Sequence, residues 1–112
     1  MSVLPAPEPR APLTGPVKFY DWNRPQQAEA LEIWGGGVFL MTNAPLAEER
    51  LITLRLQLPD GSRPFTVLGK VVRTVKGSVL RPGGMEIRFV DLSAGDRKAI
   101  DRYVQQRPLR AA

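Results

Sequence analysis

The chain has 112 residues, of which 43% are hydrophobic and 24% charged, a composition typical of one globular domain. It contains no Cys and no His, which excludes disulfides, thiolate metal sites and histidine catalysis, so we expect no enzymatic activity. No apolar run reaches the roughly 18 residues of a membrane helix and no secretory leader is recognisable, which favours the cytoplasm. The 16 basic and 11 acidic residues favour an anionic partner or serve only a soluble surface.

Residues 1–16 contain five prolines among few residues that could pack. Each proline removes a backbone donor and drives the preceding residue towards an extended conformation. We therefore expect a flexible tail without a helix or a paired strand, which acts either as a plain leader or as a docking peptide.

Residues 17–22 are rich in aromatic and β-branched side chains, which predicts a first strand that ends in a turn at residues 23–25. The alternation of a strand places Tyr20 and Trp22 on one face, together with a lysine. These two aromatic side chains either form a stacking platform for bases or cover the open end of a barrel.

Three consecutive glycines, residues 35–37, interrupt a strand-like run from residue 28 to residue 42. Glycine weakens a strand, so the run predicts a bulge, a sharp bend or a place where another group approaches the backbone closely. The Gln, Ala, Leu and Glu residues at 26–33 also permit a short helix before the glycines.

The remaining elements follow from alternation and capping. Residues 51–58, 65–75 and 85–90 alternate apolar with polar residues, as half-buried antiparallel strands do. Ser93 and Asp96 resemble a capping box at the start of a helix that ends near residue 107. Five or six short antiparallel strands with glycine bends favour a small closed or nearly closed barrel, followed by one helix.

Four segments fall in the order seen in PilZ domains, namely residues 36–40, 51–58, 69–73 and 84–89. The chain resembles a single-domain PilZ protein over residues 17–107, with residues 1–16 and 108–112 as tails. The resemblance implies a mainly β, six-stranded antiparallel barrel with a C-terminal helix. Many PilZ domains are receptors for the bacterial second messenger cyclic di-GMP, which is therefore the ligand that the resemblance implies.

PilZ receptors hold this messenger with an Arg-x-x-x-Arg pair and an Asp/Asn-x-Ser-x-x-Gly segment. The matching positions of the second motif are Glu32, Trp34 and Gly37 in this sequence. Trp34 replaces a small hydroxyl with a bulky indole whose only polar group is a donor. We expect this segment to be a degenerate recognition motif whose glycine persists.

The basic residues upstream of the glycines are Arg10, Lys18 and Arg24, and no two of them have the spacing of the arginine pair. Each lost charged hydrogen bond costs about 1.5–3 kcal/mol, or roughly one to two decades in affinity. We expect the chain to have lost the standard binding of cyclic di-GMP. In an alternative hypothesis one of the three, Arg24 in particular, substitutes for the clamp.

The leading hypothesis is therefore a non-enzymatic PilZ-like module that acts through a protein partner, without membrane insertion or a metal. The resemblance implies a role in bacterial motility, type IV pilus or polarity regulation. The candidate contact residues are Trp22, Lys70, Arg73, Arg97 and Arg102. A third hypothesis is a basic barrel that binds single-stranded nucleic acid through Tyr20 and Trp22.

Overall fold

The computed structural model describes residues 8–107. Seven strands precede one helix in the chain: β1 (Arg10–Pro12), β2 (Pro16–Asp21), β3 (Arg24–Trp34), β4 (Gly37–Met41), β5 (Leu51–Leu56), β6 (Phe65–Val75), β7 (Gly84–Phe89) and α1 (Ala94–Gln106). The predicted tail at 108–112 and the first seven residues of the predicted tail at 1–16 lie outside the described residues.

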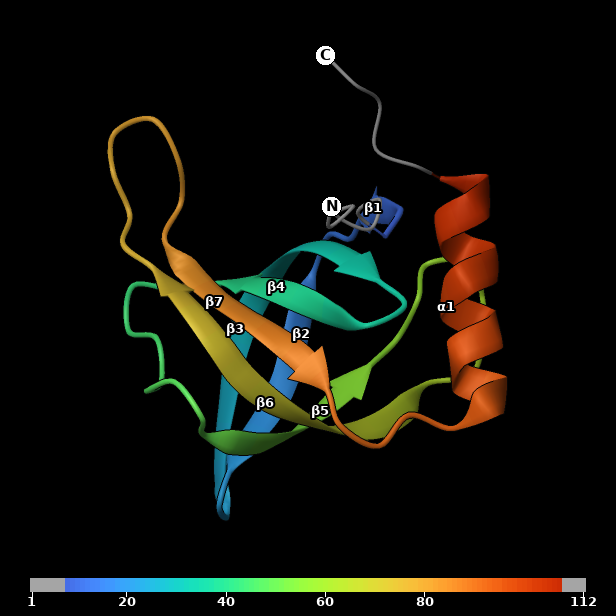
Figure 1. Ribbon diagram of the computed structural model, residues 1–112, viewed down its shortest axis with the longest axis horizontal. Helices are drawn as coiled ribbons and strands as arrows, with labels where there is room; N and C mark the ends of the chain where they lie inside the picture. Colours follow the sequence, from blue (N-terminus) through green and yellow to red (C-terminus); the bar gives the residue numbers. More distant parts are fainter. Residues whose placement is uncertain (1–7, 108–112) are drawn as a thin grey trace, which may run out of the picture.

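Six antiparallel strands close into a barrel in the order β3-β2-β5-β6-β7-β4, with β4 pairing back onto β3. The short strand β1 adds to β3 outside this ring, and α1 stands along one side of the barrel (Figure 1). The predicted mainly β barrel with a C-terminal helix is confirmed. Because the ring is closed, each of the six strands pairs with a neighbour on both sides. The barrel therefore avoids the long unpaired edge that makes an open sheet prone to aggregation.

Strict alternation of inward and outward side chains builds the core. In β2, Val17 and Phe19 are buried while the residues between them are exposed. The same pattern places Ile52, Leu54 and Leu56 of β5 inside, at 1% exposure or less. Because a one-residue slip would turn each of these sets to water, burial specifies the register of the barrel.

The expectation that residues 1–16 contain no paired strand is wrong at β1. Arg10 lies opposite Trp34 and Pro12 lies opposite Glu32. Ala11 and Leu13 are buried in the core, at 0% and 2% exposure, and this burial outweighs the cost of the prolines. Proline is tolerated because β1 is an edge strand that pairs on one side only.

The predicted turn at residues 23–25 is also misplaced. The two-residue turn consists of Trp22 and Asn23, while Arg24 pairs with Asp21 and Pro25 pairs with Tyr20. Strand β3 therefore begins four residues before the predicted strand at residue 28, and the alternative of a helix at 26–33 is wrong. Trp22 has a φ of 58° at the first turn position, a conformation that is uncommon for a bulky residue.

Helix α1 follows the predicted capping. The Ser93 side chain accepts a hydrogen bond from the Asp96 amide at 3.1 Å, as in a capping box. Ile100, Tyr103 and Val104 are buried against β1 and β3. The Tyr103 hydroxyl donates to the Pro12 carbonyl oxygen at 2.7 Å, and burial raises the pKa of this hydroxyl. This bond joins the last element of the chain to the first.

One buried carboxylate makes the stability of the barrel depend on pH. Asp21 is 5% exposed and accepts two hydrogen bonds from Arg50, at 2.7 and 3.0 Å. The hydrogen bond from Arg50 holds the pKa of Asp21 below its ordinary value. A depressed pKa means that this pair stabilises the folded state above the unfolded-state pKa of about 3.9, and that this contribution is lost as pH falls through the folded-state value.

We therefore expect Asp21→Asn to lower the melting temperature at neutral pH and to flatten the fall of the melting temperature between pH 6 and pH 2. Thermal unfolding followed by circular dichroism measures both effects. Asp91→Asn removes the charge of an exposed carboxylate and is the matched control. If the melting temperature fell equally steeply with acid in Asp21→Asn and in the unsubstituted chain, Asp21 would not be the group responsible for the pH dependence.

Candidate functional site

The three glycines lie at a sharp chain reversal. Trp34 pairs with Gly37, so that Gly35 and Gly36 form the two-residue turn between β3 and β4. None of the three glycines has a positive φ. The β3 bulge lies at Leu31 instead, where the register shifts between Ala30 and Glu32. The predicted sharp bend is confirmed. Its glycines are needed because neighbouring atoms occupy the positions of their Cβ atoms, and not because the backbone has a positive φ.

The indole of Trp34 is one of the groups that approach Gly36 and Gly37 closely. A Cβ atom on Gly37 would lie 2.9 Å from Cζ2 of Trp34, and one on Gly36 would lie 3.2 Å from its Nε1. A Cβ atom on Gly35 would collide with the guanidinium of Arg97 on α1. Side chains at positions 36 and 37 would push the indole away, so the glycines and Trp34 form one packing unit.

Arg10 of β1 covers the outer side of this indole. Its guanidinium carbon lies 3.9 Å from the centre of a Trp34 ring, within the range of a cation–π interaction. Its Nη1 atom donates to Oε1 of Glu32 at 2.5 Å. Trp34 is only 6% exposed, so its indole is held between the glycines and the arginine.

A row of residues across four strands extends this arrangement. Glu32 of β3 faces Phe39 of β4, which faces Glu86 of β7, which faces Arg73 of β6. Arg73 Nη2 lies 3.3 Å from Glu86 Oε1, and Arg10 Nη2 lies 3.9 Å from the same oxygen. We call Arg10, Glu32, Trp34, Arg73 and Glu86 the Arg10 cluster.

The Arg10 cluster balances two guanidinium groups against two carboxylates. Glu32 and Glu86 are about one-fifth exposed, and the charge of Arg10 is shared between them. An incoming phosphate would meet a carboxylate beside each arginine of the cluster, so neither of these two positive charges is unopposed. No group of three or more metal-ligating side chains occurs within residues 8–107.

The structure brings together only part of the predicted ligand site. Glu32, Trp34 and Gly37 lie together and Arg10 joins them, whereas Arg24 is at the opposite end of β3, ten residues from Trp34 along the strand. Sequence reasoning missed the partnership of Arg10 because its proline-rich surroundings argued against a strand.

The predicted contact residues lie on separate parts of the surface. Trp22 is 81% exposed at the β2–β3 turn, and Lys70 of β6 pairs with Glu49 at 2.7 Å. Arg73 belongs to the Arg10 cluster. Arg97 of α1 bonds Glu8 at 2.9 Å and Asp101 at 3.3 Å, and the exposed Arg102 lies on the same helix. These residues do not form one surface.

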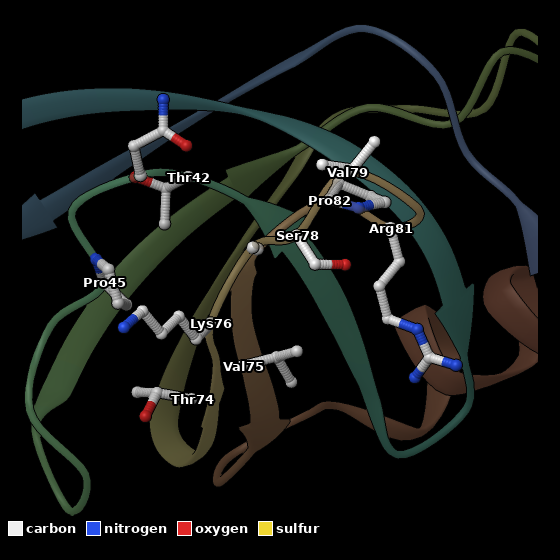
Figure 2. Close-up of a pocket in the computed structure, with 12 residues that line it drawn as sticks. Thr42, Pro45, Thr74, Val75, Lys76, Ser78, Val79, Arg81 and Pro82 are labelled. Carbon is white, nitrogen blue, oxygen red and sulfur yellow. The ribbon is translucent and has the colours of Figure 1, made fainter.

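A concavity of about 590 Å³ lies between the β6–β7 loop and the segment after β4. Thr42, Pro45, Thr74 and several loop residues line it, and none of the predicted site residues does. Figure 2 shows that its two cationic side chains, Lys76 and Arg81, extend in different directions. Because the two charges do not converge, we assign no anion site to it.

A sequence profile of the PilZ domain matches residues 7–106. The chain belongs to the PilZ domain family. No curated protein is significantly similar to it in sequence. The match begins before β1 and ends with the last residue of α1.

Two of the solved structures that share the fold of this PilZ domain illustrate the likeness. The inhibitor of motility MotI/DgrA of Bacillus subtilis superposes with a TM-score of 0.78 at 15% identity, over 93% of this chain and 51% of that protein. The PilZ domain of CeSA from a cellulose-synthesising bacterium superposes with a TM-score of 0.60 at 18% identity, over 87% and 95% of the two chains. The chain thus spans about half the length of the motility inhibitor.

The one helix of this PilZ domain within residues 8–107 is too short and too polar to cross a membrane. Within the same residues, every buried polar side-chain atom has a hydrogen-bond partner. The buried groups around the Arg10 cluster therefore need no additional ligand to satisfy them.

Proposed function

We propose that this PilZ domain is a non-enzymatic cytoplasmic signalling or adaptor module that does not bind cyclic di-GMP in the standard way. It acts through protein contacts in bacterial motility or polarity regulation. The observation that carries the proposal is the Arg10 cluster. Arg10 binds Glu32 and covers the ring of Trp34, and these two residues stand at positions that match the guanine-recognition motif of the family.

Binding of a cyclic dinucleotide at this place would have to break these contacts. A guanine base would compete with the Trp34 indole for the backbone of Gly36 and Gly37. Each phosphate would compete with Glu32 and Glu86 for Arg10 and Arg73. A desolvated cation–π contact is worth about 0.5–2 kcal/mol, and this is lost together with an ion pair.

The role in motility rests on two supports. The family is one of signalling and adaptor domains, and the fold matches that of a motility inhibitor. The likeness of fold supports the general role, while the partner and the pathway belong to the proposal.

Isothermal titration calorimetry with cyclic di-GMP tests the loss of standard binding. We expect no binding of micromolar strength or tighter, because the two charged hydrogen bonds of the arginine pair are missing. Each of these bonds is worth about one to two decades in the dissociation constant. Binding at that strength would overturn the proposal and support a receptor with a non-standard clamp. Arg10→Ala and Arg24→Ala would then distinguish an arginine inside the cluster from one at the far end of β3.

A further inference from the structure

The outer sides of three neighbouring strands form a continuous surface away from the Arg10 cluster. Lys18 lies opposite Arg55, and Tyr20 lies opposite Thr53, which in turn faces Leu68. We call this surface the ladder face. It comprises Lys18 and Tyr20 of β2, Trp22 of the turn, Leu51, Thr53 and Arg55 of β5, and Thr66, Leu68 and Lys70 of β6.

Large apolar side chains are exposed together on the ladder face. Tyr20 and Leu68 are 37% exposed, Leu51 is 54% exposed and Trp22 is 81% exposed. They line one groove of about 450 Å³, together with Glu49, Arg50, Ile52 and Thr53. Scattered apolar residues are normal on a surface, but a contiguous apolar groove with a polar rim is typical of an interaction site.

Trp22 occupies its position at a cost to folding. Its φ of 58° lies in the left-handed region, which costs a bulky residue on the order of 1–3 kcal/mol. Gly, Asn or Asp normally occupies such a turn position. Because the indole is mostly exposed, its burial in the folded chain does not offset the strain. Figure 1 shows the β2–β3 turn projecting beyond the rest of the barrel.

The charges of the ladder face are unbalanced at one end. Lys18 and Arg55 are direct cross-strand neighbours with the same charge, an arrangement that destabilises a sheet. Within residues 8–107 neither of them has a carboxylate at ion-pair distance. A hollow of about 220 Å³ lies against both side chains. A carboxylate from a partner would relieve the repulsion between them.

The other end of the face is nearly neutral. Arg50 is paired with Asp21, and Lys70 is paired with Glu49. The ladder face is therefore apolar in the middle, nearly neutral at the Trp22 end and cationic at the Lys18 end. This arrangement is complementary to a peptide segment that carries its apolar side chains and its carboxylates at different positions along its length.

We propose that the ladder face binds an acidic segment of a partner protein. Apolar side chains of the segment enter the groove beside Trp22, and its carboxylates reach Lys18 and Arg55. The proposal rests on the proposed function, since it supplies the surface for the protein contact. A protein fits better than a nucleic acid because the groove is lined mainly by aliphatic and paired charged residues, whereas phosphate contacts dominate nucleic-acid interfaces.

Selection of a random peptide library displayed on phage, with the full chain as the target, tests this proposal. We expect enrichment of peptides in which Asp or Glu residues flank an aromatic or aliphatic anchor. Fluorescence anisotropy with an enriched peptide then measures affinity for the variants. We expect Trp22→Ser and the double variant Lys18→Glu/Arg55→Glu each to weaken binding by about tenfold or more.

Matched controls lie on the β6–β7 loop. Val79→Ser removes a fully exposed apolar side chain, and Lys76→Glu/Arg81→Glu makes the same change of charge as the ladder-face double variant. Both should leave the affinity within about twofold, because surface charges away from an interface contribute little. Circular dichroism of each variant establishes that the barrel is folded.

Four results would overturn the inference. The first two are enrichment of peptides without acidic residues and an equal loss of affinity in the controls. The other two are binding of a single-stranded oligonucleotide at physiological salt that Trp22→Ser abolishes, and a dimer in sedimentation that Trp22→Ser dissociates. Failure of the selection leaves the messenger titration unaffected, since that experiment concerns the Arg10 cluster. Conversely, tight cyclic di-GMP binding would refute the proposed function without altering the peptide result.

Discussion

Replacing Trp34 by Ala should lower the free energy of unfolding by about 3–5 kcal/mol, as for other buried Trp and Phe side chains. The indole is 6% exposed and packs against the backbone of Gly36 and Gly37. Its removal also leaves the Arg10 guanidinium without its ring contact. Since domains of this size are stable by only about 5–15 kcal/mol, the substitution removes a large part of the total.

The chain contains its own control for this experiment. Trp22 is 81% exposed, so Trp22→Ala removes the same side chain from a surface turn. We expect that change to stay within about 0.5 kcal/mol of the unsubstituted chain, because the side chain that is removed is mostly exposed and Ala keeps the Cβ atom that causes the strain at the positive φ. Urea denaturation followed by far-ultraviolet circular dichroism measures both variants without depending on tryptophan fluorescence.

Equal losses in the two variants would contradict the placement of Trp34 in the Arg10 cluster. A small loss in Trp34→Ala would mean that the indole is free to leave the glycines. A guanine could then take its place, which would favour the alternative of a cyclic di-GMP receptor. The experiment thus connects the stability of the fold to the proposed absence of a ligand.

Local patterns predicted the long regular elements of the fold. The alternation of residues 65–75 and the capping residues Ser93 and Asp96 specify β6 and the start of α1 directly. Strand β1 could not be predicted in this way, because three residues with a proline carry no periodic signal. Its stability comes from the burial of Ala11 and from pairing with residues of β3 that lie 20 to 24 positions further along the chain.

The candidate site was predictable in composition but not in its contacts. Alignment of a known motif picked out Glu32, Trp34 and Gly37, and these three do lie together. Which group approaches the glycines depends on the rotamer of Trp34 and on the pairing of Arg10, both of which are long-range properties. The positive φ of Trp22 likewise follows from a hairpin register that placed the turn one residue earlier than its sequence suggested.

Replacing Gly37 by Ala is the second substitution with a large expected effect. A Cβ atom there would overlap the carbonyl oxygen of Ile87 in β7 and lie 2.9 Å from the Trp34 ring. The backbone of β7 cannot move without breaking its pairing with β4, where Gly37 lies opposite Arg88. Overpacking of this kind costs about 1–3 kcal/mol, and more where the neighbour is backbone.

Gly95→Ala is the control and should have the opposite sign. A Cβ atom on Gly95 has no heavy atom within 4 Å, and the residue lies in the first turn of α1. We expect a gain of up to about 1 kcal/mol from the higher helix propensity of Ala. Urea denaturation curves of the two variants measure the difference.

A loss in Gly37→Ala together with a gain in Gly95→Ala would establish that Gly37 is required for packing even when no ligand is present. If Gly37→Ala were as stable as the unsubstituted chain, the close approach of Ile87 and Trp34 would be wrong. The persistence of this glycine in a degenerate motif would then need a ligand as its explanation. In this PilZ domain the glycine keeps its place because the barrel itself, through β7 and the Trp34 indole, fills the space that a side chain would take.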